Sequence, residues 1–115
     1  MKFIKSYQQF ESIDSHIEFM LADYDIHDYK INEDGSVDVF QNVKLKGIPG
    51  PKIPIKFRKV NGDFDCSRNS LETLENCPIE VTGSFYCYGN KRLINLVGGP
   101  KIVHVQYDCS HCELD

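Results

Sequence analysis

Two hydrophobic positions separated by one polar residue recur along the second half of the chain, each time followed by an asparagine or cysteine and then a leucine. The clearest copy is Phe64–Leu71 (FDCSRNSL). Twenty-one residues later Phe85–Asn90 (FYCYGN) repeats it, and twenty-two residues after that Tyr107–Leu114 (YDCSHCEL) does so again. Because alternate residues of a strand face opposite sides, each copy predicts a short strand with one inward face.

A fourth copy lies upstream, at Val37–Asn42 (VDVFQN), with Leu45 as its leucine. This alignment gives the first strand position to Val37, Phe64, Phe85 and Tyr107. It gives the second strand position to Val39, Cys66, Cys87 and Cys109, and the asparagine position to Asn42, Asn69, Asn90 and Cys112. The first interval is then six residues longer than the second, so we expect a longer outer loop over Lys52–Lys59.

The pattern apolar-x-apolar-x-x-Asn-x-Leu at a fixed period is typical of leucine-rich repeats. Strands from successive coils would stack into a parallel ladder, and the asparagine amide can bond backbone groups where the chain turns away. We therefore predict an α+β fold, a short leucine-rich-repeat-like solenoid with a parallel strand ladder and an N-terminal capping helix. Residues 31–115 would form three repeats and a partial fourth.

Residues 1–30 lie outside the repeats and predict the capping helix. Their hydrophobic residues fall on one stripe at helical spacing: Phe10, Ile13, Ile17, Met20, Leu21 and Tyr24. Ser6 with Gln9 could form a capping box, and Ser12 is a second candidate start. Because a solenoid leaves an apolar surface on its first coil, a helix here would cover that end within one structural domain. The alternative is a helix that docks into a partner.

The composition excludes some classes of protein. No hydrophobic run of the 115 residues is long enough to suggest a membrane span, and the first residues do not resemble a secretory signal. The net charge of −4 argues against a dedicated nucleic-acid-binding protein. Five cysteines, an odd number, favour free thiols in a reducing cytoplasm.

The outward side chains of the predicted ladder are the candidate binding surface. The alignment places seven such residues there: Asp38, Phe40, Asp63, Asp65, Tyr86, Tyr88 and Asp108. Exposed aromatic residues on a rigid sheet are typical of protein-binding surfaces, and the carboxylates would favour a basic partner protein and repel phosphate. The alternative is that strand surfaces simply accept tyrosine and aspartate.

Charge is also uneven along the chain. Residues 11–38 carry nine acidic residues, whereas residues 44–59 carry six basic residues and no acidic one. The basic stretch suggests an alternative function, a nucleic-acid-binding accessory protein, although such charge runs are more often solvated loops.

One short motif could carry chemistry, Cys109-Ser110-His111-Cys112, which could be half of a zinc or redox site. The repeat accounts for both cysteines without a metal, since Cys109 takes the position of Cys66 and Cys87, and Cys112 takes the asparagine position. No phosphate-binding loop, nucleophile elbow or histidine metal motif is present in the sequence. We therefore expect no enzyme, no metal and no cofactor.

The phrases at residues 31–39, 60–67 and 83–90 resemble short leucine-rich-repeat-like proteins encoded by tailed bacteriophages. The resemblance covers residues 29–115. It implies a protein of the host bacterial cytoplasm that binds and occludes a host protein, such as a defence or nucleic-acid-processing factor. The chain differs in having few repeats and in stopping inside the last one. We expect the exposed last strand to be covered by a partner or by a second copy, as a homodimer.

Overall fold

The computed structural model describes residues 15–114. Within that range, residues 15–23 form one helix and nine short strands follow it. The strands are β1 (Tyr29–Ile31), β2 (Val37–Val39), β3 (Val43–Lys44), β4 (Phe57–Val60), β5 (Phe64–Asp65), β6 (Glu80–Val81), β7 (Phe85–Tyr86), β8 (Ile102–Val103) and β9 (Tyr107–Asp108). None of the helical segments between residues 15 and 114 is long and apolar enough to cross a bilayer.

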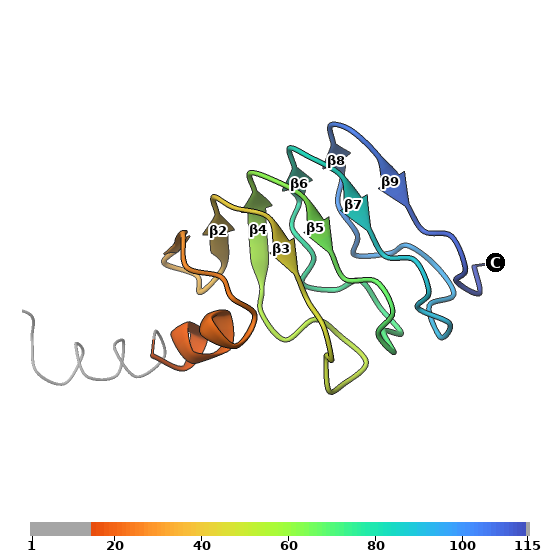
Figure 1. The fold of residues 1–115 in the computed structure, drawn as a ribbon, viewed down its shortest axis with the longest axis horizontal. Coiled ribbons are helices and arrows are strands. Elements are labelled where there is room, and N and C mark those ends of the chain that lie inside the picture. Colours follow the sequence, from red (N-terminus) through yellow and green to blue (C-terminus); the bar gives the residue numbers. More distant parts are fainter. Residues whose placement is uncertain (1–14, 115) are drawn as a thin grey trace, which may run out of the picture.

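The strands form two sheets that run side by side along a solenoid (Figure 1). Sheet A has the order β1-β2-β4-β6-β8 and sheet B the order β3-β5-β7-β9. All neighbouring strands are parallel except β1 and β2. Each coil gives one strand to each sheet, with a three-residue corner between them. The predicted α+β solenoid with a parallel ladder is confirmed, and the second sheet was not predicted.

Stacked hydrophobic side chains fill the space between the two sheets. Phe64 and Phe85 are fully buried, and their parallel rings lie 5.9 Å apart between centroids. Phe57 meets Phe64 edge to face at 5.2 Å, and Tyr107 meets Phe85 in the same way at 4.9 Å. Such ring pairs stabilise the fold by about 1 kcal/mol each beyond their buried area. The inward positions predicted from the alternation at residues 64 and 85 are therefore core positions.

The alignment of the first repeat was wrong by six residues. Val43, not Val37, lies in register with Phe64, and Lys44 lies beside Asp65. Val37 belongs instead to β2 of sheet A, where it lies beside Phe57. The segment VDVFQN matched the template because it is also a strand, followed by a corner that contains an asparagine. With Val43 as the reference, the first interval is twenty-one residues, equal to the second.

This correction removes the long outer loop expected over Lys52–Lys59. Phe57–Val60 forms β4 in the middle of sheet A. Ile53 and Ile55 are buried in the core just before it. The segment is therefore an ordinary part of the second coil.

The helix lies at the β1 and β2 end of the solenoid (Figure 1). Leu21 and Ile26 are buried in the main core, and Ile17, Met20 and Tyr24 pack against it. This part of the predicted helical stripe faces the core. Phe10 and Ile13, with the capping candidates Ser6, Gln9 and Ser12, lie outside the described residues.

Candidate protein-binding surface on sheet B

Two rows of outward side chains cross sheet B. Strand register aligns Lys44, Asp65, Tyr86 and Asp108 in the first row. Two residues further along each strand comes the second row, Lys46, Ser67, Tyr88 and Ser110. Backbone hydrogen bonds continue the register there, since the Arg68 N–H donates to Tyr88 O at 2.8 Å. We call these two rows, together with Arg68 and Lys91, the sheet B face.

Of the seven predicted surface residues, four lie together on the sheet B face: Asp65, Tyr86, Tyr88 and Asp108. The other three, Asp38, Phe40 and Asp63, do not. Their displacement follows from the six-residue error, which had put β2 into the wrong sheet, and from the position of Asp63 at a corner. Lys44 and Lys46 stand where Asp38 and Phe40 were expected.

Asp38 lies in sheet A, and its carboxylate is bonded within the protein. It is only 7% exposed and receives hydrogen bonds from both Nε and Nη2 of Arg58, the first at 2.8 Å. Asn32 Nδ2 donates a third bond at 3.3 Å. The Arg58 bonds hold the pKa of this carboxyl below its ordinary value, against the opposing effect of burial. Asp38 therefore has little left to offer a partner.

Asp63 and Phe40 lie at corners between the sheets. Asn42 Oδ1 accepts the Asp63 N–H at 2.8 Å, and Asp63 Oδ1 accepts the Ser84 N–H at 2.8 Å, so these side chains link successive coils. A Cβ on Gly83 would lie 2.2 Å from Asp63 Oδ1, so only glycine leaves room for this link. Phe40 is 45% exposed and belongs to neither of the two rows of the sheet B face. Asp63 thus has a structural position.

The two carboxylates that remain on the sheet B face each close a tight turn. Asp65 Oδ1 accepts the Ser67 N–H at 2.9 Å, and Asp108 Oδ1 accepts the Ser110 N–H at 2.9 Å and its hydroxyl at 2.8 Å. The Ser110 bonds lower the pKa of Asp108. Both side chains keep their second oxygen for other contacts.

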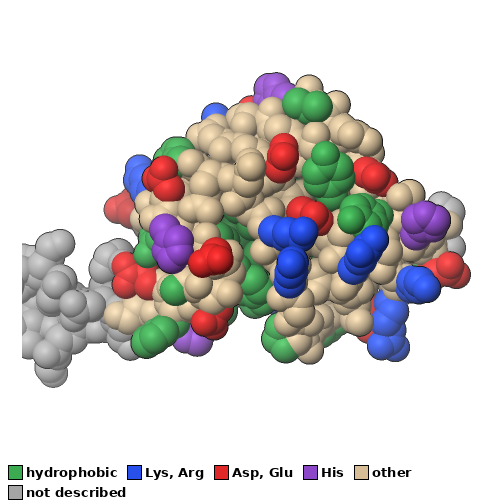
Figure 2. Space-filling model, in the orientation of Figure 1, with side chains coloured by type: hydrophobic (Ala, Val, Ile, Leu, Met, Phe, Trp, Pro, Cys, Tyr) green, Lys and Arg blue, Asp and Glu red, His purple; other side chains and the backbone are tan. Residues whose placement is uncertain are grey.

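Basic side chains occupy the other half of the surface, which the sequence analysis missed. Arg68 lies over the ring of Tyr88, with its guanidinium carbon 5.3 Å from the ring centroid, a cation–π contact. This pair forms a ridge between two shallow hollows. One is lined by Lys44 and Lys46, the other by Lys91 and His111. Figure 2, which looks onto sheet B, shows Lys and Arg side chains gathered below its acidic and hydrophobic side chains.

These cations have no acidic partner in the part of the chain that the structure describes. Among residues 15–114, none of Lys44, Lys46, Arg68 and Lys91 takes part in an ion pair. Arg68 also has a left-handed backbone, with φ of 58°, at a position where the neighbouring coils have Gly47 and Gly89. Counting twenty-one residues back from Asp65 and Ser67 gives Lys44 and Lys46. The correct period would therefore have placed both lysines on this surface.

The basic stretch 44–59 is mostly paired with acids from other coils. Lys52 Nζ lies 3.6 Å from Glu75 Oε2, Lys56 Nζ lies 3.5 Å from Asp34 Oδ2, and Lys59 Nζ lies 3.7 Å from Glu80 Oε1. Arg58 is paired with Asp38. Only Lys44 and Lys46 of the six remain without such a pair among the described residues, so the stretch is not a continuous basic loop.

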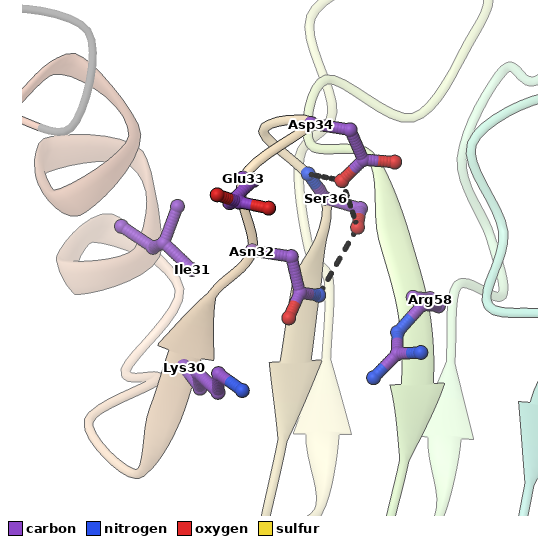
Figure 3. A pocket seen from close by; sticks show the side chains of 7 residues that line it. All are labelled: Lys30, Ile31, Asn32, Glu33, Asp34, Ser36 and Arg58. Carbon is purple, nitrogen blue, oxygen red and sulfur yellow. Dashed lines mark hydrogen bonds between the residues drawn. The ribbon is translucent and has the colours of Figure 1, made fainter. Parts of the chain in front are cut away.

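Another hollow lies on sheet A beside β1 and β4, lined by Lys30, Ile31, Asn32, Glu33, Asp34, Ser36 and Arg58 (Figure 3). Asp34 Oδ1 accepts bonds from the Ser36 N–H at 3.0 Å and the Ser36 hydroxyl at 2.6 Å. These bonds, the hydroxyl first, lower the pKa of Asp34 to about 2. Asn32 Nδ2 donates to Ser36 Oγ at 3.1 Å. Several of its polar groups are thus bonded to one another, which makes the hollow a weak candidate for a ligand site.

The cysteines follow the repeat. Cys112 Sγ donates to Cys87 O at 3.2 Å, as Asn90 Nδ2 does to Cys66 O at 3.0 Å one coil earlier, so Cys112 does occupy the asparagine position. Cys87 and Cys109 touch, with their sulfurs 2.6 Å apart, and the bond with Cys109 together with burial raises the pKa of the Cys87 thiol. Within residues 15–114 no three or more His, Cys, Asp or Glu side chains are arranged to hold a metal ion.

The sheet B face is thus the surface on which aromatic rings and unpaired cations come together over a rigid ladder. Its side chains come from β3, β5, β7, β9 and the turns that follow them. Comparisons with models of known protein families, with curated proteins and with solved structures found no match for this chain.

Proposed function

We propose that this protein is a non-catalytic protein-binding module that binds its partner through the sheet B face. The observation that carries the proposal is the Arg68–Tyr88 pair, raised between two hollows and flanked by unpaired lysines. Tyrosine and arginine are the residues most often found at the energetic centre of interfaces, and hollows beside them accept a partner's side chains. A parallel sheet is a rigid support, so little backbone freedom is lost on binding.

The charge of the face argues for a different partner from the basic one expected from the sequence. Four cations, Lys44, Lys46, Arg68 and Lys91, stand against the carboxylates of Asp65 and Asp108. Complementary charge steers association and fixes the orientation of the complex. We therefore propose a partner protein that presents acidic side chains to the hollows and an apolar group to Tyr86 and Tyr88.

The resemblance to leucine-rich-repeat-like phage proteins supports a more specific proposal. The chain would be a phage leucine-rich-repeat protein in the host bacterial cytoplasm, and its partner a host protein that it inhibits by occlusion. Inhibition would need no chemistry of its own, because a bound solenoid covers its partner's surface. A host defence or nucleic-acid-processing factor would suit this role.

The test uses a double variant in which each new residue is the one found at the equivalent position of neighbouring coils. Arg68→Gly takes the residue of positions 47 and 89, and Tyr88→Ser takes that of positions 67 and 110, so the backbone should be preserved. Lys101→Ala/Ile79→Ala is the matched control, which removes a cation and an exposed apolar side chain directly before β8 and β6 of sheet A. Wild type and control should capture the same protein from a bacterial lysate, and the Arg68→Gly/Tyr88→Ser variant should lose it.

With the partner purified, the dissociation constant should rise roughly tenfold or more for the double variant, since central Tyr and Arg residues commonly contribute 2 kcal/mol or more. Equal capture by all three proteins would refute the proposed surface. Loss of capture by the control alone would place the interface on sheet A.

The same surface favours a second candidate, a single-stranded nucleic acid, because tyrosine rings beside lysine and arginine suit base stacking with phosphate contacts. The net charge of −4 argues against it. A salt titration separates the two candidates. Binding of a labelled single strand that weakens steeply between low and physiological salt, and depends on Lys44 and Lys46, would favour nucleic acid.

A further inference from the structure

One end of the solenoid has an apolar surface with open strand edges. Ile102, Val105 and Tyr107 are 49%, 73% and 39% exposed there. Within residues 15–114 no strand pairs with the outer edge of β8 or of β9 (Figure 1). Open edges beside exposed apolar side chains favour pairing with another chain.

The opposite end is partly covered, although among residues 15–114 no strand pairs with the outer edge of β1 or of β3. Antiparallel β1 pairs with β2 and ends sheet A, and the helix packs Leu21 into the core beside it. A head-to-tail stack would place the helix and the antiparallel β1 of one copy against the open edges of the other. Two open ends in contact bring the ends of the two parallel ladders together and give a closed two-fold dimer.

The last coil has the symmetry that this dimer needs. Its two strands, Ile102–Val103 and Tyr107–Asp108, have equal length and lie on either side of a three-residue corner centred on Val105. A two-fold axis through that corner would place β8 against β9 of the second copy, running antiparallel, and β9 against its β8. Val103 would then lie opposite Tyr107 of the other copy, and Val105 would lie on the axis.

The backbone on the open edges matches this pairing. His104 N–H donates to Val81 O, so the N–H and C=O of the preceding residue, Val103, point to the open edge. In sheet B, Gln106 O and Asp108 O accept bonds from β7, so the groups of Tyr107 between them point outward too. An antiparallel hydrogen-bonded pair needs both groups of both residues on the facing edges.

The inward side chains of β8 and β9 also fit this pairing. Val103 continues the inward column of Val81, and Tyr107 continues that of Phe85. The pairing would therefore place an inward residue opposite an inward one, so that the cores of the two copies become continuous across the junction.

From this coincidence of symmetry, hydrogen-bonding groups and pleat, we propose that a second copy of this chain closes the open end as a two-fold dimer, with β8 paired to β9 in both directions. The inference does not rest on the proposed function, because the junction would pair backbone groups on the open edges of β8 and β9, whereas the sheet B face consists of outward side chains. The dimer would carry two such faces.

Analytical ultracentrifugation over roughly 1 to 500 µM tests the proposal, using the full chain. Wild type should pass from monomer to dimer within this range. Val105→Asp would set two carboxylates against each other on the axis and should raise the dissociation constant at least about tenfold. Phe19→Asp is the control, since Phe19 is 74% exposed but lies on the helix at the covered end, and it should leave the constant unchanged. A wild type that stays monomeric throughout would overturn the proposal.

Amide hydrogen exchange tests the pairing itself. The N–H groups of Val103 and Tyr107 should exchange fast in dilute protein and slowly in concentrated protein, while the bonded N–H of His104 should change little. A dimer in which both amides still exchange fast, or one that Val105→Asp leaves intact, would refute the assigned geometry. Both measurements are independent of any partner protein.

Discussion

Both sheets are built from the same coils. The side chains that link neighbouring coils lie on the outer surface of one sheet and on the inner surface of the other. In sheet A the joining bonds lie on the outer surface, as ion pairs between side chains of successive strands. In sheet B they lie behind the strands, as buried amides. The difference has a functional consequence, because a surface whose charges are already paired has little to offer a partner. The sheet joined from within keeps its outer side chains available.

Sheet A shows the first arrangement. Arg58 of β4 holds Asp38 of β2, and Glu80 of β6 accepts contacts from Lys59 on one side and from His104 on the other, whose Nε2 lies 2.8 Å from Glu80 Oε2. These contacts, His104 first, lower the pKa of Glu80. The charged side chains of this sheet thus link successive coils of the solenoid.

Sheet B shows the second arrangement. Asn90 is fully buried, and its Nδ2 donates to Cys66 O at 3.0 Å and to Cys87 O at 2.9 Å. Its Oδ1 accepts the N–H groups of Asn69 and Leu71, both at 3.2 Å. One side chain therefore satisfies four backbone groups of two coils, without using the outer surface.

The largest effect is expected from Asn90→Ala. The backbone N–H groups of Asn69 and Leu71 would lose their partner inside the protein, at roughly 1–3 kcal/mol for each group that water cannot reach. Cys66 O and Cys87 O would each lose one bond but keep another, from Asn69 Nδ2 and Cys112 Sγ. We expect the free energy of unfolding to fall by about 3 kcal/mol or more, measured by urea denaturation followed by circular dichroism. Asn95→Ala is the control, because exposed Asn95 bonds only the N–H of Val97. If both variants lose the same small amount, sheet B is not held together by its buried amides.

A smaller loss is expected from Asp38→Asn in sheet A. The amide cannot replace the charge that Arg58 meets, and charge-assisted bonds contribute about 1.5–3 kcal/mol. Because Arg58 is half exposed and can be solvated, we expect a loss of about 1–2 kcal/mol at pH 7 in urea denaturation. Asp65→Asn, in the matching outward position of sheet B, should cost less, since Asp65 accepts one backbone N–H and forms no ion pair with any residue of the range 15–114.

The pH dependence of this loss follows from the lowered pKa of Asp38. When the folded pKa lies below the unfolded one, the stabilisation is full above the unfolded value, near 4, and disappears as the pH falls through the folded value. The wild type should therefore lose its advantage over Asp38→Asn as the pH falls below about 4. A difference that does not shrink as the pH falls further below this value would show that the charge of Asp38 contributes nothing to stability.

The sequence predicted those parts of the fold that depend on side-chain alternation and period. Phe64 and Phe85 were placed correctly inside, and Cys112 in the asparagine position, because each copy has the same spacing. Sheet A was missed because β4, β6 and β8 do not carry the pattern apolar-x-apolar-x-x-Asn-x-Leu that marks the strands of sheet B. Val37 and Val39 do alternate, and they were taken for the strand that Val43 begins.

Some residues of the candidate surface could be predicted from the sequence for the same reason. Tyr86, Tyr88, Asp65 and Asp108 follow from the period alone. Lys44 and Lys46 required the correct first register, and the pairing of Asp38 with Arg58 joins residues twenty positions apart in the chain. Which cations are neutralised, and therefore which surface is free, is decided by contacts between coils that a local pattern does not contain.

The smallest expected effect is a change in thermal stability on removal of lysines, and it compares the two sheets most directly. Lys44→Gln/Lys46→Gln removes two cations of sheet B that have no ionic partner among the described residues, so thermal stability should stay within experimental error. Lys59→Gln removes one cation of sheet A that lies 3.7 Å from Glu80, and should lower the melting temperature slightly at low salt. Added salt screens exposed pairs, so this deficit should shrink at about 0.5 M sodium chloride. If the sheet B variant loses more stability than Lys59→Gln, its lysines support the fold, and the surface proposed for binding is not a free one.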